Sequence, residues 1–242
     1  MFLLWEAGGQ VVGFAARDPE ENDLGVFVAP TLEHTPDAIA LEDTALAWAS
    51  ERGTSVQWME FDDEHDAVRR WAERGYLPTP GGYLNLTAGL ERVDPHGPAD
   101  RRVGSVADED IADRAAITHA AFGSSRPLAD YVADYERFRA SPAYPHGWDL
   151  VLHDDDGRAA ACCIAWIDPT SRVGTFEPVA THPRAEGRGY ARALLTEGLR
   201  RFAAAGMTYA IVGVVIGNER AEAVYRSVGF APDRVLRSFE RS

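Results

Sequence analysis

The spacing of apolar residues predicts alternating strands and helices over residues 101–242. Runs of β-branched and aromatic residues bounded by turn formers predict strands at 102–106, 148–153, 158–168, 173–181 and 207–216. Apolar residues at steps of three and four after Pro183 predict a helix that ends at Gly206. Two shorter helices are predicted at 108–122 and 127–139. The whole pattern indicates an α/β (α+β) fold.

The predicted strand at 173–181 leads into the turn Arg184-Ala-Glu-Gly187-Arg-Gly189, which opens the long helix. Two glycines let the backbone approach a ligand closely, and successive amides at a helix N-terminus attract an anion. A P-loop is excluded because no Gly-Lys-Ser/Thr is present. A dinucleotide-binding turn is excluded because Arg192 stands where the third glycine is required. The turn therefore predicts a pyrophosphate site, with a plain strand-to-helix connection as the alternative.

A second motif follows the last of these strands. Asn218 is followed seven residues later by Tyr225 and then by a Gly-Phe pair at 229–230. Asn218 is a good helix N-cap, and Tyr225 falls on the apolar face of the helix behind it. The two motifs, in this order and at this separation, resemble the signature of the GNAT N-acetyltransferase superfamily. The resemblance covers residues 101–242 and implies a mixed, mostly antiparallel sheet flanked by helices.

This resemblance implies direct transfer of an acetyl group from acetyl-coenzyme A to an amine, without a covalent enzyme intermediate. It implies that the pyrophosphate of coenzyme A binds the Gly-rich turn and that the pantetheine arm pairs with the preceding strand. By position in the motif, Val179 supplies the amide that binds the thioester carbonyl, and Thr181 pairs with the arm. The implied cofactor-binding residues are Val179, Ala180, Thr181, Arg184, Gly187, Arg188, Gly189, Tyr190, Ala191 and Asn218.

Acetyl transfer requires that the amine lose a proton and that the departing thiolate be stabilised or protonated. The family uses the Tyr of the second motif as the acid, so Tyr225 is the predicted catalytic acid; the alternative is a core aromatic residue. Glu177 is the candidate base, since it precedes Val179 by two residues and would share its face of an extended strand. The alternative is a solvated or salt-bridged Glu177, turned away by a kink at Pro178.

The first third of the chain repeats the same strand-helix-strand-helix order. The step from Pro30 to Gly53 equals that from Pro183 to Gly206, and a Gly-aromatic-x-Pro sequence closes both copies. In the first copy the repeat predicts a helix, a strand and a helix at 37–52, 54–59 and up to Gly75. We therefore expect two tandem lobes, with a reduced lobe at 1–92, a linker at 93–100 and a catalytic domain at 101–242.

The first lobe lacks the residues that the chemistry needs. Alignment of the copies puts Thr31, His34 and Pro36 at the positions of the arginine and the two glycines, and Glu64 and Trp71 opposite Asn218 and Tyr225. Without glycines the backbone cannot approach a pyrophosphate, and an indole supplies no hydroxyl proton. We expect this lobe to pack rather than catalyse, as in an actinobacterial-type tandem member of the family. A family domain opens with a strand and two helices, for which there is no room before Met1, so either the start is missing or the lobe is reduced.

Composition limits the cellular compartments and the partners that are compatible with the sequence. The chain is 45% hydrophobic and 26% charged, and no apolar run approaches the roughly 20 residues of a membrane span. Glu6 interrupts the apolar start too early for a signal peptide. The adjacent Cys162 and Cys163 cannot readily close an unstrained disulfide, which favours a reduced pair in a cytoplasmic protein. No His/Cys spacing suggests a metal site.

The formal net charge of -14 argues against nucleic acid or an anionic membrane as a partner. It leaves room for a cationic acceptor such as an amine, either a small molecule or a peptide, and a homodimer is compatible with the sequence. An active N-acetyltransferase is the favoured function, because the turn, Asn218 and Tyr225 all lie in one lobe. The alternatives are a coenzyme A-binding module without turnover and a structural or partner-binding protein; only the degenerate lobe supports the last.

Overall fold

The structure is a computed structural model that describes residues 2–17, 24–32, 35–51, 57–100 and 102–241. The chain forms two compact units. Unit 1 consists of residues 1–84 together with 234–242, and unit 2 consists of residues 85–233. Two long strands, β5 (Tyr76–Gly89) and β11 (Ala231–Arg241), therefore contribute one end to each unit.

Unit 1 contains a three-stranded antiparallel sheet in the order β1-β2-β3. Its elements, besides the ends of β5 and β11, are β1 (Phe2–Ala7), β2 (Gln10–Arg17), β3 (Leu24–Val28), α1 (Pro36–Ser50), β4 (Gln57–Phe61) and α2 (His65–Glu73). β4 pairs antiparallel with the end of β11. The core of the unit combines Trp71 of α2, Tyr76 of β5 and Phe239 of β11, all buried. The last strand of the chain therefore completes the core of its first unit.

Unit 2 contains the strand order β5-β10-β9-β8-β7-β6. Its strands, besides the ends of β5 and β11, are β6 (Val103–Ser105), β7 (Asp149–His153), β8 (Ala159–Asp168), β9 (Val173–Thr181) and β10 (Tyr209–Val215). Its α-helices are α3 (Ile111–Ala121), α4 (Leu128–Arg139), α5 (Tyr190–Ala204) and α6 (Glu219–Ser227), with 3-10 turns η1 (Asp108–Asp110) and η2 (Pro183–Ala185). β9 and β10 are parallel, whereas β6 to β9 are antiparallel neighbours.

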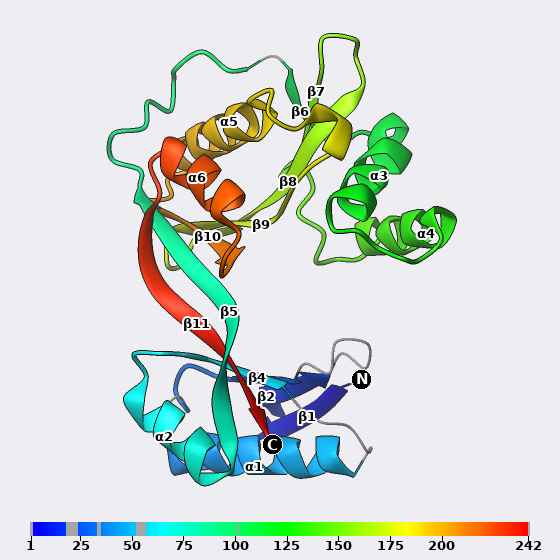
Figure 1. The fold of residues 1–242 in the computed structure, drawn as a ribbon. Helices are drawn as coiled ribbons and strands as arrows, with labels where there is room; N and C mark the ends of the chain where they lie inside the picture. Colours follow the sequence, from blue (N-terminus) through cyan, green and yellow to red (C-terminus); the bar gives the residue numbers. More distant parts are fainter. Residues whose placement is uncertain (1, 18–23, 33–34, 52–56, 101, 242) are drawn as a thin grey trace. The chain divides into compact units, whose positions relative to one another are not determined.

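Helices cover both faces of this sheet, with α3 and α4 on one side and α5 and α6 on the other (Figure 1). Side chains alternate between the faces as a pleated strand requires. Cys162 and Ala180 pack with Ile117 of α3. On the opposite face the Phe176 ring packs so closely on Gly198 of α5 that a Cβ there would lie 2.5 Å from it. Residue 198 is therefore a position where only glycine fits.

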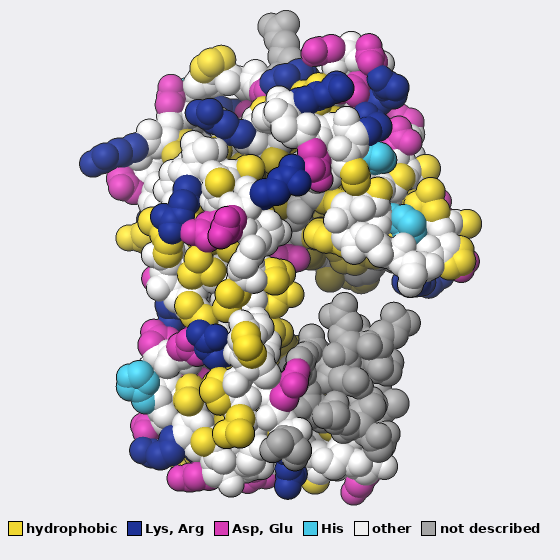
Figure 2. All heavy atoms as spheres, in the orientation of Figure 1, with side chains coloured by type: hydrophobic (Ala, Val, Ile, Leu, Met, Phe, Trp, Pro, Cys, Tyr) yellow, Lys and Arg dark blue, Asp and Glu magenta, His cyan; other side chains and the backbone are white. Residues whose placement is uncertain are grey.

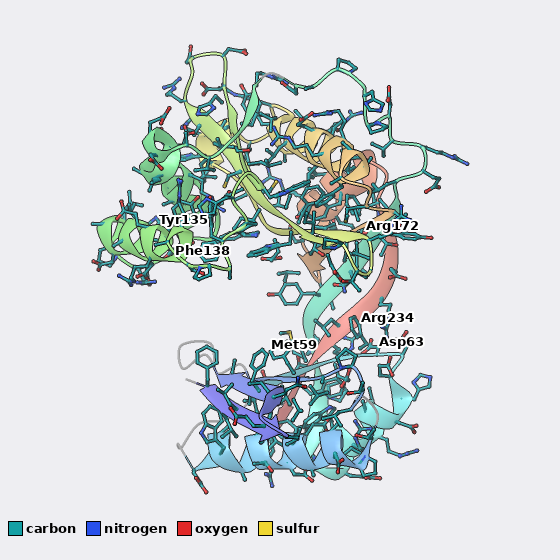
Figure 3. All side chains as sticks on the ribbon, turned by 180° about the vertical axis from the view of Figure 1, so that it is seen from behind. Met59, Asp63, Tyr135, Phe138, Arg172 and Arg234 are labelled. Carbon is teal, nitrogen blue, oxygen red and sulfur yellow. The ribbon has the colours of Figure 1, made fainter. Side chains whose placement is uncertain are left out.

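A buried polar network attaches α3 and α4 to β7. The Arg114 guanidinium donates from Nε to Asp149 at 3.2 Å, and the Tyr135 and Tyr144 hydroxyls donate to the same carboxylate at 2.7 and 3.2 Å. Arg114 and Asp149 are 3% and 1% exposed, so the ion pair is shielded from water. Figure 3 shows Tyr135 and Phe138 together on α4. Removing one partner would leave a buried charge unpaired, so the network holds these helices in place.

The order of elements agrees with the predicted tandem α/β architecture, which is confirmed. The helix predicted to follow the Gly-rich turn begins at Tyr190 and ends at Ala204, with η2 at the start of the turn. The hairpin of β1 and β2 was not predicted, although Gly8-Gly9 between two apolar runs is a hairpin signal. His34, Gly53 and residues 54–56 of the predicted strand lie outside the described residues.

Candidate functional site

The Gly-rich turn connects β9 to α5 in unit 2. Gly187 and Gly189 have φ values of 74° and 78°, a left-handed conformation that strains other residues. Gly189 is also the N-cap residue of α5. No atom lies within 4 Å of the place where a Cβ would project at either glycine. The first turn of α5 is thus open to a ligand, and the helix dipole favours an anion there.

β9 and β10 pair only at their beginnings. The parallel register joins Val173 to Tyr209 and ends where Phe176 faces Val212. On the other side of β9, the His182 N–H donates to Ala160 O at 2.9 Å, which makes these two residues a hydrogen-bonded pair. Since such pairs alternate along an antiparallel ladder, the backbone groups of Val179 and Thr181 point away from β8, into the gap beyond Phe176.

A cavity of about 780 Å³ joins this gap to the glycine turn. It is lined by nine of the residues predicted from the sequence: Val179, Ala180, Thr181, Gly187, Gly189, Tyr190, Ala191, Asn218 and Tyr225. The structure therefore brings the turn and the second motif together around one space. Arg192 also lines it and was not predicted as a site residue; Phe122, at the end of α3, lines it as well. Phe122 is 59% exposed.

Two predicted arginines lie outside this lining. The Arg184 guanidinium donates from Nη1 to Asp154 at 3.1 Å and from Nη2 to Ala159 O at 2.6 Å. Its backbone N–H donates to Nδ1 of His182 at 3.2 Å. Asp154 is 7% exposed, and its pKa is held below the ordinary value chiefly by the backbone N–H of Arg158. Arg184 thus ties the turn to the β7–β8 hairpin. Arg188, the other arginine, is exposed.

Asn218 and Tyr225 come from the two ends of α6. Asn218 is the N-cap, and its Oδ1 accepts the Ala221 N–H at 3.1 Å. Tyr225 is 7% exposed, with its ring 6.2 Å from that of Phe230 in an edge-on arrangement. Burial raises the pKa of the Tyr225 hydroxyl, and the negative charge of Glu177 adds to the rise. Tyr225 therefore keeps its proton at neutral pH and can donate it.

Glu177 lies on a bulge of β9. Cys163 of β8 pairs with Val179 of β9, and Ala165 pairs with Phe176. The two β8 residues are two positions apart and the two β9 residues three, so β9 carries one extra residue between them. Phe176 and Val179 consequently face the same side although they are three residues apart. The expectation that Glu177 shares the face of Val179 stays a prediction, because the bulge interrupts simple alternation between the two residues. The Glu177 side chain keeps contact with solvent, yet atoms crowded around it raise its pKa by desolvation.

Aromatic side chains of β8 and α4 lie near the bulge that holds Glu177. The Trp166 indole N–H donates to Glu177 O at 2.7 Å and holds the backbone of the bulge. The Phe138 ring of α4 lies 6.3 Å from that of Trp166. Tyr135 of α4 is buried, and its hydroxyl donates to Asp149. The signal that would have revealed this was the polar pair Arg114 and Asp149 within otherwise apolar segments.

In unit 1, the residues aligned with the site residues of unit 2 pack in the core or form ion pairs. Trp71, aligned with Tyr225, is fully buried, and its indole N–H donates to Glu60 at 3.4 Å. Glu64, aligned with Asn218, accepts from the Arg234 guanidinium at 2.8 Å. Pro36 stands in the first turn of α1 behind the N-cap Thr35. Within the described part of unit 1, these residues do not form a glycine turn at a helix N-terminus.

Among the described residues, no group of three or more His, Cys, Asp or Glu side chains is placed to hold a metal ion. None of the helices described here is both long enough and apolar enough to cross a membrane.

Comparison with known sequences points to one family. A profile of the family described as "Acetyltransferase (GNAT) family" matches residues 115–230. A mycothiol acetyltransferase of Beutenbergia cavernae is 30% identical over 237 residues, which are 95% of this chain and 80% of that protein. A mycothiol acetyltransferase of Propionibacterium freudenreichii is 28% identical over 232 residues, or 93% of this chain and 72% of that protein.

Solved structures show the same fold. A GCN5-related N-acetyltransferase from Sphaerobacter thermophilus superposes with a TM-score of 0.65 at 18% identity, covering 96% of this chain and 77% of the other. A tandem GNAT protein from the clavulanic acid biosynthesis pathway gives a TM-score of 0.65 at 15% identity, covering 99% and 81%. At these identities the likeness concerns the fold alone.

Proposed function

Because the chain belongs to the GNAT family of N-acetyltransferases, we propose that it transfers acetyl from acetyl-coenzyme A to the amine of a small molecule or peptide. The observation that carries the proposal is the cavity of about 780 Å³ in unit 2. An open glycine turn, backbone groups of a strand without a partner and the hydroxyl of a buried tyrosine meet around it. These are the groups that an acyl-coenzyme A thioester needs for binding and for cleavage.

The cofactor-binding roles follow the length of the cavity. The amides after Gly187 and Gly189 would bind the pyrophosphate at the positive end of the α5 dipole. The backbone groups of Val179 and Thr181 would pair with the pantetheine arm as an added strand does, with Ala180 between them. Tyr190, Ala191 and Asn218 would form the walls. Arg184 would position the turn through Asp154, while Arg188 would supply a mobile positive charge.

The chemistry requires three groups near the thioester. The Val179 N–H would donate to the carbonyl oxygen, where negative charge develops as the amine nitrogen attacks the carbonyl carbon. Glu177, directly or through a water molecule, would take the proton that the nitrogen releases. When the carbon–sulfur bond breaks, Tyr225 would give its proton to the sulfur. The products are the acetamide and coenzyme A thiol, with no acyl-enzyme formed.

The acceptor is proposed to be an amine, with a mycothiol-related amine as the first to test. The support is that the relatives named above are mycothiol acetyltransferases and align over most of their length. Nucleic acid is not proposed as a partner, since Figure 2 shows basic and acidic side chains interspersed on the face that it draws. Both cysteines are free thiols, which agrees with a cytoplasmic location.

The test is release of coenzyme A thiol from acetyl-coenzyme A in the presence of a panel of amines. The panel holds mycothiol-related amines, amino sugars, amino acids and short peptides. The expected result is thiol release that depends on one class of amine, with acetamide formed in equal amount. The chain contains no lysine, so self-acetylation of side-chain amines does not confound the assay. Coenzyme A binding without thiol release for any amine would instead support the module without turnover.

A further inference from the structure

The bulge of β9 carries two of the groups that the proposed chemistry uses. Glu177 holds the proposed base, and Val179 holds the N–H proposed for the thioester oxygen. Only Pro178 separates them, and a proline has no N–H to pair with a neighbouring strand. The Glu177–Pro178 peptide can therefore be held only through the Glu177 carbonyl oxygen.

Trp166 of β8 supplies the partner of that oxygen. Its backbone pairs with Thr175, two residues before Glu177, and its half-buried indole N–H donates to Glu177 O at 2.7 Å. The indole has one donor and no acceptor, so this bond fixes a single direction. A side chain thus takes the place of the strand ladder at the point where the extra residue interrupts it.

Aromatic packing from α4 holds the indole in turn. The Phe138 ring lies 6.3 Å from that of Trp166 and 5.3 Å, edge-on, from that of Tyr144. Phe138 is labelled on α4 in Figure 3. The Tyr144 hydroxyl donates to the buried Asp149 at 3.2 Å. The indole is therefore supported by a side chain that is itself packed against the buried polar network, as a precise positioning group requires.

The proposed base and the proposed amide donor both depend on this one peptide. If the Glu177–Pro178 peptide turned, the backbone on either side would turn with it, and both the Glu177 carboxylate and the Val179 N–H would move. A misplacement of about 1 Å in a reacting geometry costs on the order of 100-fold in rate. The indole bond opposes that turn.

We propose that Trp166 is a positioning residue for acetyl transfer, which aligns the Glu177 carboxylate and the Val179 N–H through the Glu177 carbonyl. The inference rests on the proposed function, since both groups take their roles from that reaction. Trp166 acts through the backbone and transfers no proton. Its position on β8 lies outside both sequence motifs, so the motifs did not reveal it.

The test is Trp166→Phe in the full chain, which removes the indole N–H and keeps an aromatic ring beside Phe138. With the best amine of the panel, kcat is expected to fall about tenfold. The KM for acetyl-coenzyme A should stay within about twofold, because the glycine turn is unchanged. A loss of stability alone would not separate kcat from KM in this way.

The pH profile gives a second measure of the same variant. A Glu177 carboxylate released from the crowded bulge regains water, so its pKa should fall toward the ordinary 4.5. The rising limb of kcat/KM should therefore move to lower pH. Tyr225 of α6 is the titratable group that interacts with Glu177, and it stays protonated over this range.

Trp148→Phe is the matched control. It removes the same N–H from an indole that stacks on Phe202 of α5, with ring centroids 5.8 Å apart. It should leave kcat, KM and the rising limb within about twofold of wild type. Equal loss of kcat in both variants would overturn the inference.

Combining Trp166→Phe with Glu177→Gln tests whether the effect passes through Glu177. The double variant should lose about 200-fold in kcat/KM, less than the roughly 1000-fold product of the single losses. A loss equal to that product overturns the inference, as does a wild-type kcat in folded Trp166→Phe. If wild type releases no thiol with any amine, the proposed function fails and the inference with it. An active wild type with an unaffected Trp166→Phe contradicts the inference alone.

Discussion

Tyr225 and Glu177 differ in how the surrounding residues hold them. Tyr225 is fixed inside unit 2 by burial and by the edge of Phe230, so its position follows from the packing of α6. Glu177 is placed by the bulge of β9 and by the indole N–H of Trp166 on its carbonyl. The first residue was predictable from motif spacing and helix periodicity. The second was not fully predictable, because a bulge changes which face a strand residue occupies.

Changing Tyr225 to Phe keeps the ring and removes the hydroxyl. Affinity for coenzyme A should therefore hold, while kcat falls by roughly 10- to 10,000-fold, the range for losing a positioned acid. Steady-state kinetics together with a coenzyme A titration would measure both effects. Wild-type turnover in this variant would assign Tyr225 to packing alone.

The pH profile tests Glu177. Desolvation by the atoms crowded around Glu177 raises its pKa above the ordinary 4.5, and a base acts only when deprotonated. kcat/KM should therefore increase with pH through that raised pKa and then level off, since Tyr225 stays protonated well above neutrality. Glu177→Gln should lower kcat/KM by about 100-fold and remove the rising limb. A Gln variant with the wild-type profile would assign the proton transfer to another group.

At the scale of elements, β5 and β11 each have one end in unit 1 and the other end in unit 2. Asn85–Gly89 of β5 belong to unit 2, and residues 234–242 belong to unit 1. Arg234 and Asp63 lie side by side in unit 1, joined at 2.7 Å (Figure 3). Neither of these two strands was predicted from the sequence. Apolar periodicity could not predict which unit each end would join, since that depends on contacts between residues far apart in sequence.

Phe239 provides the test of this arrangement. The side chain is 1% exposed within the core of unit 1, so Phe239→Ala should destabilise the protein by about 3 to 5 kcal/mol. Leu77, 56% exposed on β5, is the control, and Leu77→Ala should cost about 0.5 kcal/mol or less. Urea unfolding followed by circular dichroism would compare the two. Equal, small effects would mean that β11 does not complete this core in solution.

At the scale of the whole molecule, the division of β5 and β11 between the two units changes where the domain boundaries should be drawn. The tandem repeat was read correctly from the sequence, because loop lengths and closing glycines recur in both copies. The prediction that residues 101–242 form the catalytic domain remains a proposal. The compact units suggest residues 85–233 as its limits instead. The first unit also supplies the residues that pair with the end of β11.

Two fragments test which limits, 101–242 or 85–233, describe the catalytic domain. Fragment 101–242 lacks the end of β5 beside β10 and keeps residues 234–242 without β4, so it exposes unpaired strand edges. Fragment 85–233 keeps unit 2 intact. We expect 101–242 to melt lower and aggregate more than both the full chain and 85–233, while 85–233 retains coenzyme A binding. A stable, monomeric and active 101–242 would show that the first unit is dispensable.

The central claim is that one coenzyme A site exists per chain and lies in unit 2. Calorimetric titration of the full chain with coenzyme A tests it directly. The account predicts one site per chain and its loss in Gly189→Glu, which puts bulk and negative charge where the phosphates bind. Gly206→Glu is the control, since Gly206 has a similar φ of 83° at the other end of α5 and open space around it. Two equivalent sites, or unchanged affinity in Gly189→Glu, would contradict the account.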